Sequence, residues 1–383
     1  MLYKFSEIAE NSKEKRMPLP EDKYNYIGLE HLDTGDLTVH RWGSDVDIKG
    51  EKLVMHKGDL LFGRRNTYLR RVAIAPHDGL FSAHGMILHP NPNVIDSSFF
   101  PFFIASDYFM DAAIRISVGS LSPTVNWSTL KELEFRLPSF DKQKELAQLL
   151  WGFERARQAY KRLLLESDKL VKSQFVEMFG DPVKNKRSWP LIPLQECLYG
   201  IDSGKSLNCE SHPRSGELPA VLKLSAVTYG EYNPDENKEL PTADEFIPEL
   251  EVHVGDLLFS RKNTREYVGM TAIVRETPKK LMLPDLIFRL LPRECIRAEY
   301  LHQLINHPQY RPVISELASG TAGSMPNISK QRLLALEIPL PPVELQTAFE
   351  PIVQQTDKSK LAIRQALESL EKSRNAIMAQ VFG

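Results

Sequence analysis

Two long stretches of the chain show the alternating 3-4 spacing of apolar residues that is typical of a helix packing along one side. In Asp141–Phe179 the only Gly or Pro is Gly152, which predicts one helix of roughly 55 Å. Its apolar stripe contains Leu146, Leu149, Phe153, Ala156, Tyr160, Leu163, Ser167 and Leu170. A second, weaker stripe in Phe349–Ile377 includes Pro351, so irregular packing is expected near the start of that helix.

Elsewhere the apolar runs are short and are broken by Gly, Pro and Asn, as in "KLVMHKGDLLF", "VAIA" and "LIFRLL". Such runs predict short strands with some helix between them. The order along the chain is therefore globular domain, helix, globular domain, helix. The predicted fold class is α+β, with a first globular domain over 1–138, a helix over 139–180, a second domain over 181–339 and a helix over 340–383. The polar, proline-ended segment "GDPVKNKRSWP" separates the halves.

The two halves repeat one another. "GDLLFGRRNT" begins at Gly58 and "GDLLFSRKNT" at Gly255, each two residues after a histidine. Three further blocks match in the same order, and they align Gly35 with Gly230, Pro123 with Pro326, and Gln143 with Gln346; both long segments end in Phe-Gly, at Phe179-Gly180 and Phe382-Gly383. Four collinear blocks indicate a duplication. If a pseudo-dyad relates the halves, the two helices lie antiparallel as a coiled-coil-like spacer that holds the domains apart; the alternative is two independent helical subdomains.

The repeated phrase predicts a hairpin with a basic tip. Gly-Asp makes a turn, "LLF" a buried strand and "VAIA" the next strand. The polar residues between them are candidate DNA contacts: Arg64, Arg65, Asn66, Thr67, Tyr68, Arg70 and Arg71 in the first copy, and Arg261, Lys262, Asn263, Thr264, Arg265 and Tyr267 in the second. Arg and Asn can read guanine and adenine edges, and Arg, Lys and Thr hold phosphates. One such loop alone would be interpreted as a solvated hairpin; the second copy favours nucleic-acid contact. We expect phosphate contacts from Arg70, Arg71 and Arg265.

"GIDSGKSLNC" at Gly200 resembles a phosphate-binding P-loop, but the first glycine is one residue too late and no helix is predicted to follow. Nucleotide hydrolysis is therefore rejected, and Lys205 and Ser206 remain candidates for a phosphate-contacting loop or a plain surface loop. His56 and His253 recur beside the repeated phrase, and a lone histidine beside a strand is usually structural.

Composition narrows the function classes. The 383 residues carry a net charge of −2, which argues against coating nucleic acid by bulk charge but not against local basic loops. Three widely spaced cysteines fit a reducing cytoplasm and give neither a disulfide framework nor a metal site. No membrane-length apolar run and no secretory signal are present. No methyltransferase, nuclease, metalloprotease or serine-hydrolase motif was found, so the chain is expected to direct another subunit's chemistry and not to be an enzyme.

With its twin basic phrases, the "SPTVN" and "MPNIS" turns and the twin long helices, the sequence resembles the specificity subunits of type I restriction-modification systems. The resemblance runs along essentially the whole chain. It implies two target-recognition domains, each of which reads one half of a split sequence in double-stranded DNA. It also implies a spacer that recruits two modification (methyltransferase) subunits and, in the full complex, a restriction (helicase-nuclease) subunit.

The resemblance further implies that this chain holds no cofactor, because S-adenosylmethionine, ATP and Mg²⁺ belong to partner subunits. The alternatives are a recognition subunit of a modification-only defence system, a stand-alone nuclease and a protein-binding scaffold.

Overall fold

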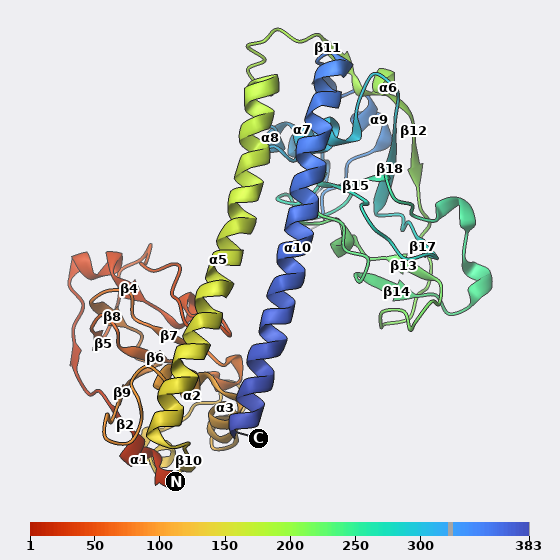
Figure 1. Cartoon of the computed structure of the whole chain (residues 1–383). Coiled ribbons are helices and arrows are strands. Elements are labelled where there is room, and N and C mark those ends of the chain that lie inside the picture. Colours follow the sequence, from red (N-terminus) through yellow and green to blue (C-terminus); the bar gives the residue numbers. More distant parts are fainter. Residues whose placement is uncertain (321–324, 383) are drawn as a thin grey trace. The chain divides into compact units, whose positions relative to one another are not determined.

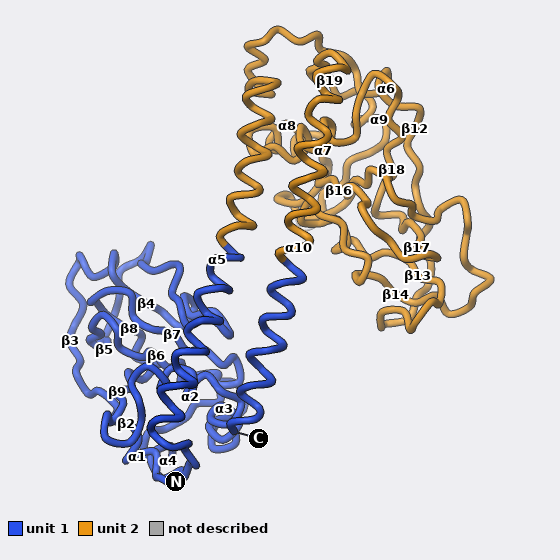
Figure 2. The backbone as a smooth tube through the Cα atoms, in the orientation of Figure 1, with its two compact units in different colours: residues 1–161, 364–383 blue, residues 162–363 orange. Residues whose placement is uncertain are grey.

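A computed structural model describes residues 1–320 and 325–382 of the chain. Residues 1–161 and 364–383 form one compact unit (unit 1), and residues 162–363 form the other (unit 2) (Figure 2). Two helices, α5 (Phe140–Phe179) and α10 (Val343–Phe382), each contribute one end to each unit (Figure 1). Gly383, the last residue of the repeated Phe-Gly pair, lies outside the described residues.

The strands of unit 1 form two four-stranded sheets and one two-stranded ribbon. The first sheet has the order β2 (Ala9–Asn11), β9 (Met86–Pro90), β6 (Leu60–Phe62), β7 (Val72–Ile74), all antiparallel. The second has the order β3 (Lys15–Arg16), β5 (Lys52–Met55), β8 (Gly79–Phe81), β4 (Tyr26–Ile27), with β4 parallel to β8. The ribbon pairs β1 (Leu2–Lys4) with β10 (Glu134–Arg136).

Unit 2 repeats part of this strand plan. Its four-stranded antiparallel sheet has the order β12 (Leu198–Ser203), β18 (Ile287–Pro292), β15 (Leu257–Ser260), β16 (Thr271–Ile273). A three-stranded sheet has the order β14 (Asn237–Glu239), β13 (Ala220–Leu222), β17 (Leu281–Met282), with β13 parallel to β17. The ribbon pairs β11 (Leu191–Pro193) with β19 (Glu337–Pro339). The antiparallel four-stranded sheet and the ribbon have the same pairing order in both units, as a duplicated chain would give. The second sheets differ, because β8 lies between β5 and β4 in unit 1, whereas β13 lies between β14 and β17 in unit 2.

Each unit also contains short helices, of which α2 (Phe100–Ala105) lies against β7 and α7 (Ala298–Asn306) lies against β16. Those of unit 1 are α1 (Phe5–Ile8), α2 (Phe100–Ala105), α3 (Asp107–Arg115) and α4 (Trp127–Leu130), with 3₁₀ turns η1 (Pro20–Tyr24), η2 (Leu29–His31) and η3 (Thr67–Leu69). Those of unit 2 are α6 (Leu194–Cys197), α7 (Ala298–Asn306), α8 (Arg311–Glu316) and α9 (Lys330–Leu334), with η4 (Leu224–Ala226), η5 (Ala243–Glu245) and η6 (Pro248–Leu250). Across the described residues, no helix is both long and apolar enough to cross a bilayer.

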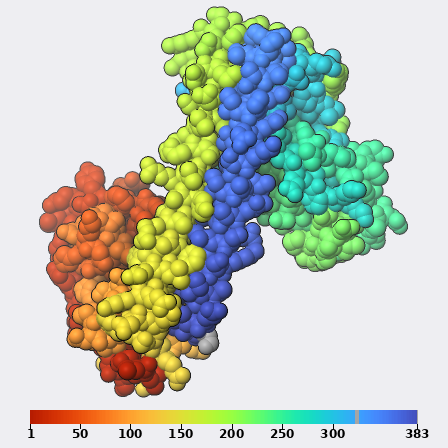
Figure 3. Space-filling view, in the orientation of Figure 1, coloured from red at the N-terminus to blue at the C-terminus, as the bar shows by residue number. Residues whose placement is uncertain are grey.

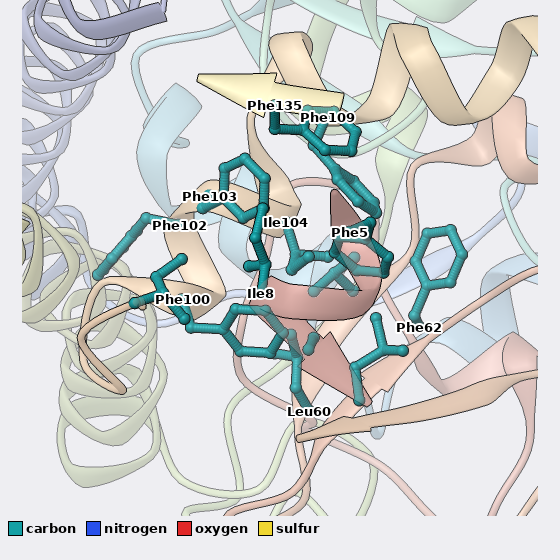
Figure 4. Packing of buried hydrophobic residues seen from close by; sticks show 14 of the residues in the cluster. Phe5, Ile8, Leu60, Phe62, Phe100, Phe102, Phe103, Ile104, Phe109 and Phe135 are labelled. Atoms are coloured by element: carbon teal, nitrogen blue, oxygen red, sulfur yellow. The ribbon is translucent and has the colours of Figure 1, made fainter. Parts of the chain in front are cut away.

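The core of unit 1 is rich in phenylalanine (Figure 4). Phe5, Phe62, Phe109 and Phe135 come from different elements and are at most 1% exposed. The ring of Phe5 lies 5.1 Å from that of Phe109 and 5.9 Å from that of Phe135. Burying each such ring contributes about 1.5–3 kcal/mol, so these rings hold the strands and short helices of unit 1 in one body.

The end of α10 completes this core. The ring of Phe382 stacks on Tyr108 at 5.4 Å and on Phe99 at 5.9 Å. Ile377, Met378 and Val381 pack against the same cluster. Unit 1 is therefore closed by residues from the far end of the chain.

In unit 2, α5 and α10 pack against each other through aromatic rings. Phe179 lies 5.3 Å from Phe349, near the start of α10, whereas Asp168, earlier in α5, pairs with Lys360. Within unit 2 the two helix segments therefore run antiparallel. Irregular packing was expected at Pro351, but α10 is continuous through it and Phe349 is fully buried.

The predicted apolar stripe of α5 was partly wrong. Leu149, Leu163 and Leu170 are 46%, 50% and 52% exposed, and Figure 3 shows side chains of α5 (yellow) at the surface. The residues buried along α5 are instead Gln143, Leu146, Ala147, Leu150, Glu154, Arg157, Val171, Phe175 and Phe179. A single 3-4 stripe fails because the two ends of α5 pack against different units, each with its own buried face.

Candidate nucleic-acid interface

The repeated Gly-Asp pair forms the same turn in both units. Gly58 and Gly255 have φ values of 95° and 96°, which only glycine adopts readily. The Asp59 carboxylate accepts a hydrogen bond from the His56 N–H at 2.8 Å, and that of Asp256 accepts one from His253 at 2.9 Å. Both imidazoles are exposed, at 59% and 65%. The repeated phrase therefore encodes a backbone turn to which these histidines contribute their main chain.

Each turn leads into the predicted hairpin. In unit 1, β6 and β7 pair antiparallel and are joined by residues 63–71, the first basic loop. In unit 2, β15 and β16 pair in the same way and are joined by residues 261–270, the second basic loop.

Both basic loops are fixed to the proline turns further along the chain. Asn66 N–H donates to the Pro123 carbonyl at 2.7 Å, and Val125 N–H donates to Arg64 O at 2.9 Å. In unit 2, Asn263 N–H donates to Pro326 O at 3.3 Å, and Ile328 N–H donates to Arg261 O at 2.8 Å. The matched sequence blocks are thus in contact in the same register, and each basic loop is held by its backbone.

The structure sorts the fifteen candidate side chains by exposure. Thr67 and Asn263 are buried. The exposed candidates are Tyr68, Lys205, Ser206, Thr264 and Arg265. The partly exposed candidates are Arg64, Arg65, Asn66, Arg70, Arg71, Arg261, Lys262 and Tyr267.

Thr67 and Asn263 have internal partners, so the expectation that they contact DNA is corrected. The Thr67 hydroxyl donates to Arg64 O at 2.8 Å. The Asn263 amide donates to the Thr228 hydroxyl at 3.1 Å and accepts from the Thr264 N–H at 2.8 Å. These side chains brace the basic loops from inside and do not reach the surface.

The arginines of the first basic loop differ in how they are held. Arg70 has φ of 50° and forms ion pairs with Asp107 and Asp111 of α3, so its charge is already balanced. Arg65 donates to the Ser122 hydroxyl at 3.2 Å. Burial, followed by the positive charges of Arg65 and Arg64, lowers the pKa of the His84 imidazole.

In the second basic loop, Arg261 is held over the ring of Phe288 at 5.0 Å, and its Nε donates to Asn327 Oδ1 at 3.0 Å. Tyr267 packs edge-on against Tyr229, a largely exposed ring, at 5.5 Å. Sequence reasoning missed Phe288, Asn327 and Tyr229. Tyr229 stands beside Gly230 in an aligned block, and this is the signal that could have found it.

Lys205 and Ser206 lie just after β12, in a segment without helix, so the rejection of a P-loop agrees with the structure. The Lys205 backbone forms a β-bridge with Pro284. The residue after Pro284 is Asp285, and its backbone carbonyl accepts a hydrogen bond from the Arg261 guanidinium at 3.5 Å. The predicted Lys205 segment therefore lies close to the second basic loop. Among the described residues, no group of three or more His, Cys, Asp or Glu is arranged to hold a metal ion.

Comparison with known proteins identifies the relatives of the chain. Residues 1–165 match the family model of the type I restriction modification DNA specificity domain. The chain is similar in sequence to the specificity subunits of type I restriction enzymes. The specificity subunit of the Escherichia coli type I restriction enzyme EcoEI is 30% identical over 55% of this chain. That of MjaVIII from Methanocaldococcus jannaschii is 21% identical over 94% of this chain and 85% of its own length.

The matches to the EcoEI and MjaX specificity subunits cover only 36% and 32% of those relatives' length. Solved structures share the fold over the whole chain. The type I S subunit from M. genitalium has a TM-score of 0.62 at 14% identity, covering 100% of this chain and 96% of that one. A chain from a structure concerning assembly and conformational transition of the type I R-M system has a TM-score of 0.52 at 19% identity, covering 100% and 97%.

Proposed function

We propose that the chain is the DNA specificity subunit of a type I restriction-modification complex, which reads a split sequence in double-stranded DNA through its two basic loops. One observation carries the proposal: two hairpins of similar sequence, each fixed to a proline turn by equivalent backbone hydrogen bonds, present basic side chains. Arginine, lysine and asparagine in fixed loops suit both base edges and phosphates.

The spacer role is part of the same proposal. α5 and α10 each contribute residues to both units, so a change in helix length would change the separation between the basic loops. Leu149, Leu163 and Leu165 are exposed on α5, which supports this helix as a docking surface for two modification subunits. In the proposed complex, those subunits and a restriction subunit hold S-adenosylmethionine, Mg²⁺ and ATP.

The test uses the full chain assembled with its modification subunits and a library of duplexes with two randomised half-sites and spacers of varied length. The expected result is selection of one split sequence at one spacer length, with affinity that falls steeply as salt rises. Binding without any sequence preference, or cleavage of plasmid DNA by the chain alone with a metal ion, would contradict the proposal.

A second experiment tests whether α5 and α10 set the length of the DNA spacer. About seven helix-forming residues are inserted after Lys161 in α5 and a matched seven after Ile363 in α10, where the units divide. About 10 Å of added helix corresponds to about three base pairs. The selected spacer should lengthen by about that amount while both half-sites stay the same; changed half-sites with an unchanged spacer would refute the spacer role. Equal-length substitutions at these positions serve as the control.

A further inference from the structure

Each unit ties its globular part to its long helix through an acidic residue that follows a left-handed glycine. Gly35 and Gly230 have φ values of 73° and 80°, and Asp36 and Glu231 follow them. The Asp36 carboxylate pairs with Arg157 at 2.9 Å and with Lys161 at 2.8 Å, both on α5.

The equivalent residue of unit 2 makes the equivalent pair. Glu231 pairs with Lys360 on α10, and Lys360 also pairs with Asp168 at 2.6 Å. We call the Asp36 and Glu231 pairs with their helix cations the two acid clasps.

Arg157 and Lys360 occupy the same position in the repeat. Each follows, by the same number of residues, a glutamine near the start of its helix, Gln143 or Gln346. The exposed fraction of each glutamine is 1% or less. Each accepts a hydrogen bond at 2.8 Å from a backbone N–H of its own unit, that of Asp96 or Arg297. The glutamine and the acid clasp are thus two attachment points, both duplicated, between a globular part and a helix.

The turn that carries each clasp also contacts the basic loop. The Thr34 hydroxyl donates to the Leu69 carbonyl at 2.7 Å, and Thr34 bridges to Arg71. In unit 2, the neighbour of Gly230, Tyr229, packs on Tyr267. One short turn therefore lies between the basic loop and the helix in each unit and contacts both.

We propose that Asp36 and Glu231 are positioning residues that fix the angle between each basic loop and its helix, and thereby restrict the DNA to one spacer length. The proposal rests on the proposed function. A hydrogen-bonded ion pair is directional. Because the buried glutamine is a second attachment point on the same helix, the globular part cannot rotate freely about the ion pair. Neither acid is a DNA contact in this scheme, so the bases selected do not depend on them.

The test repeats the library selection with Asp36→Asn, Glu231→Gln and Lys360→Met in the full chain assembled with its modification subunits. Half-site bases should stay the same. Binding to targets whose spacer is one base pair longer or shorter should rise about tenfold relative to the best spacer, since one base pair rotates the second half-site by about 36°. Lys360→Arg, which keeps the charge, should retain the single spacer.

Matched controls remove exposed acidic partners nearby. Asp33→Asn breaks the surface pair with Arg41, and Glu236→Gln breaks that with Lys223; both should keep the wild-type spacer. Lys161→Gln removes the more exposed partner of Asp36 and covers the case in which Asp36→Asn does not fold; it should relax the spacer partly.

A purely structural role predicts an equal loss on every target, and that result, or an unchanged spacer preference in folded variants, would overturn the proposal. If the wild-type chain itself selects no split sequence, the proposed function fails, which is a distinguishable outcome.

Discussion

The two basic loops share a backbone and differ in how their charges are presented. Both are pinned to a proline turn by equivalent hydrogen bonds. In the first, Arg70 is held by two aspartates of α3; in the second, Arg265 is exposed and the guanidinium of Arg261 lies over the ring of Phe288. The comparison teaches that the scaffold of the site is repeated while its recognition chemistry is not, as two different half-sites would require.

The acid clasps differ in the same manner. The side chain of Asp36 is 5% exposed and faces a guanidinium that is 7% exposed, whereas the side chain of Glu231 is 44% exposed and faces a lysine that is 10% exposed. Removing the buried Asp36 carboxylate leaves Arg157 with Glu154 alone in a site with little water. Removing Glu231, which water already reaches, leaves Lys360 paired with the partly exposed Asp168. The clasp of unit 1 should therefore be the stronger.

The largest expected effect is a difference in the free energy of unfolding between variants of the two acid clasps. Asp36→Asn should lower the free energy of unfolding by about 3–5 kcal/mol, and Glu231→Gln by about 1 kcal/mol or less. Urea unfolding of the full chain measures both. Equal losses would show that burial does not distinguish the clasps.

The pH dependence of stability tests the acid clasp of unit 1 separately. Burial alone would raise the pKa of Asp36, but the Lys161 ammonium, the Thr38 N–H and the Arg157 charge together lower it to about 2. Because this carboxyl titrates near 3.9 when unfolded, its ionised form contributes about 2 kcal/mol of stability above pH 4. That contribution is lost as the pH falls through 4 towards 2. The stability gap between wild type and Asp36→Asn, measured by urea unfolding, should narrow over this range; a constant gap would contradict the lowered pKa.

A substitution in one basic loop should weaken recognition of one DNA half-site and leave the other unchanged. Arg261→Ala should weaken recognition at one half-site by about 1–3 kcal/mol, and Arg64→Ala at the other, if each contacts a base. Competition binding with targets mutated in one half-site measures the effect. A loss that is the same for every sequence would instead assign the arginine to a phosphate.

The smallest expected effects are on the salt dependence of DNA binding, where Arg265 and Arg70 should differ. Arg265→Ala should reduce the slope of log affinity against log salt by about 1 if it neutralises a phosphate. Arg70→Ala should change it little, because Asp107 and Asp111 already balance this arginine. Replacing both aspartates by asparagine should free Arg70 and steepen the slope by about 1. A large effect of Arg70→Ala in the wild-type background would mean that DNA displaces the aspartates.

The sequence predicted what repetition and local pattern encode: the duplication, the hairpins around the Gly-Asp turns and a helix at α5. It did not predict burial within the basic loops, because Thr67 and Asn263 look as polar as their neighbours and their internal partners come from the fold. It also misplaced the buried face of α5, where Glu154 and Arg157 are buried as a pair while Leu149 is exposed. A hydrophobic period cannot identify a polar face that is buried by ion pairing.

Phe382, which is partly buried, stacks on Tyr108 and Phe99 against the aromatic core that includes Phe5. During synthesis on the ribosome, the first half of the chain emerges well before the residues that complete its core. Unit 1 therefore cannot reach its final packing until α10, which also supplies Phe349 and Val353 to the core of unit 2, has been made.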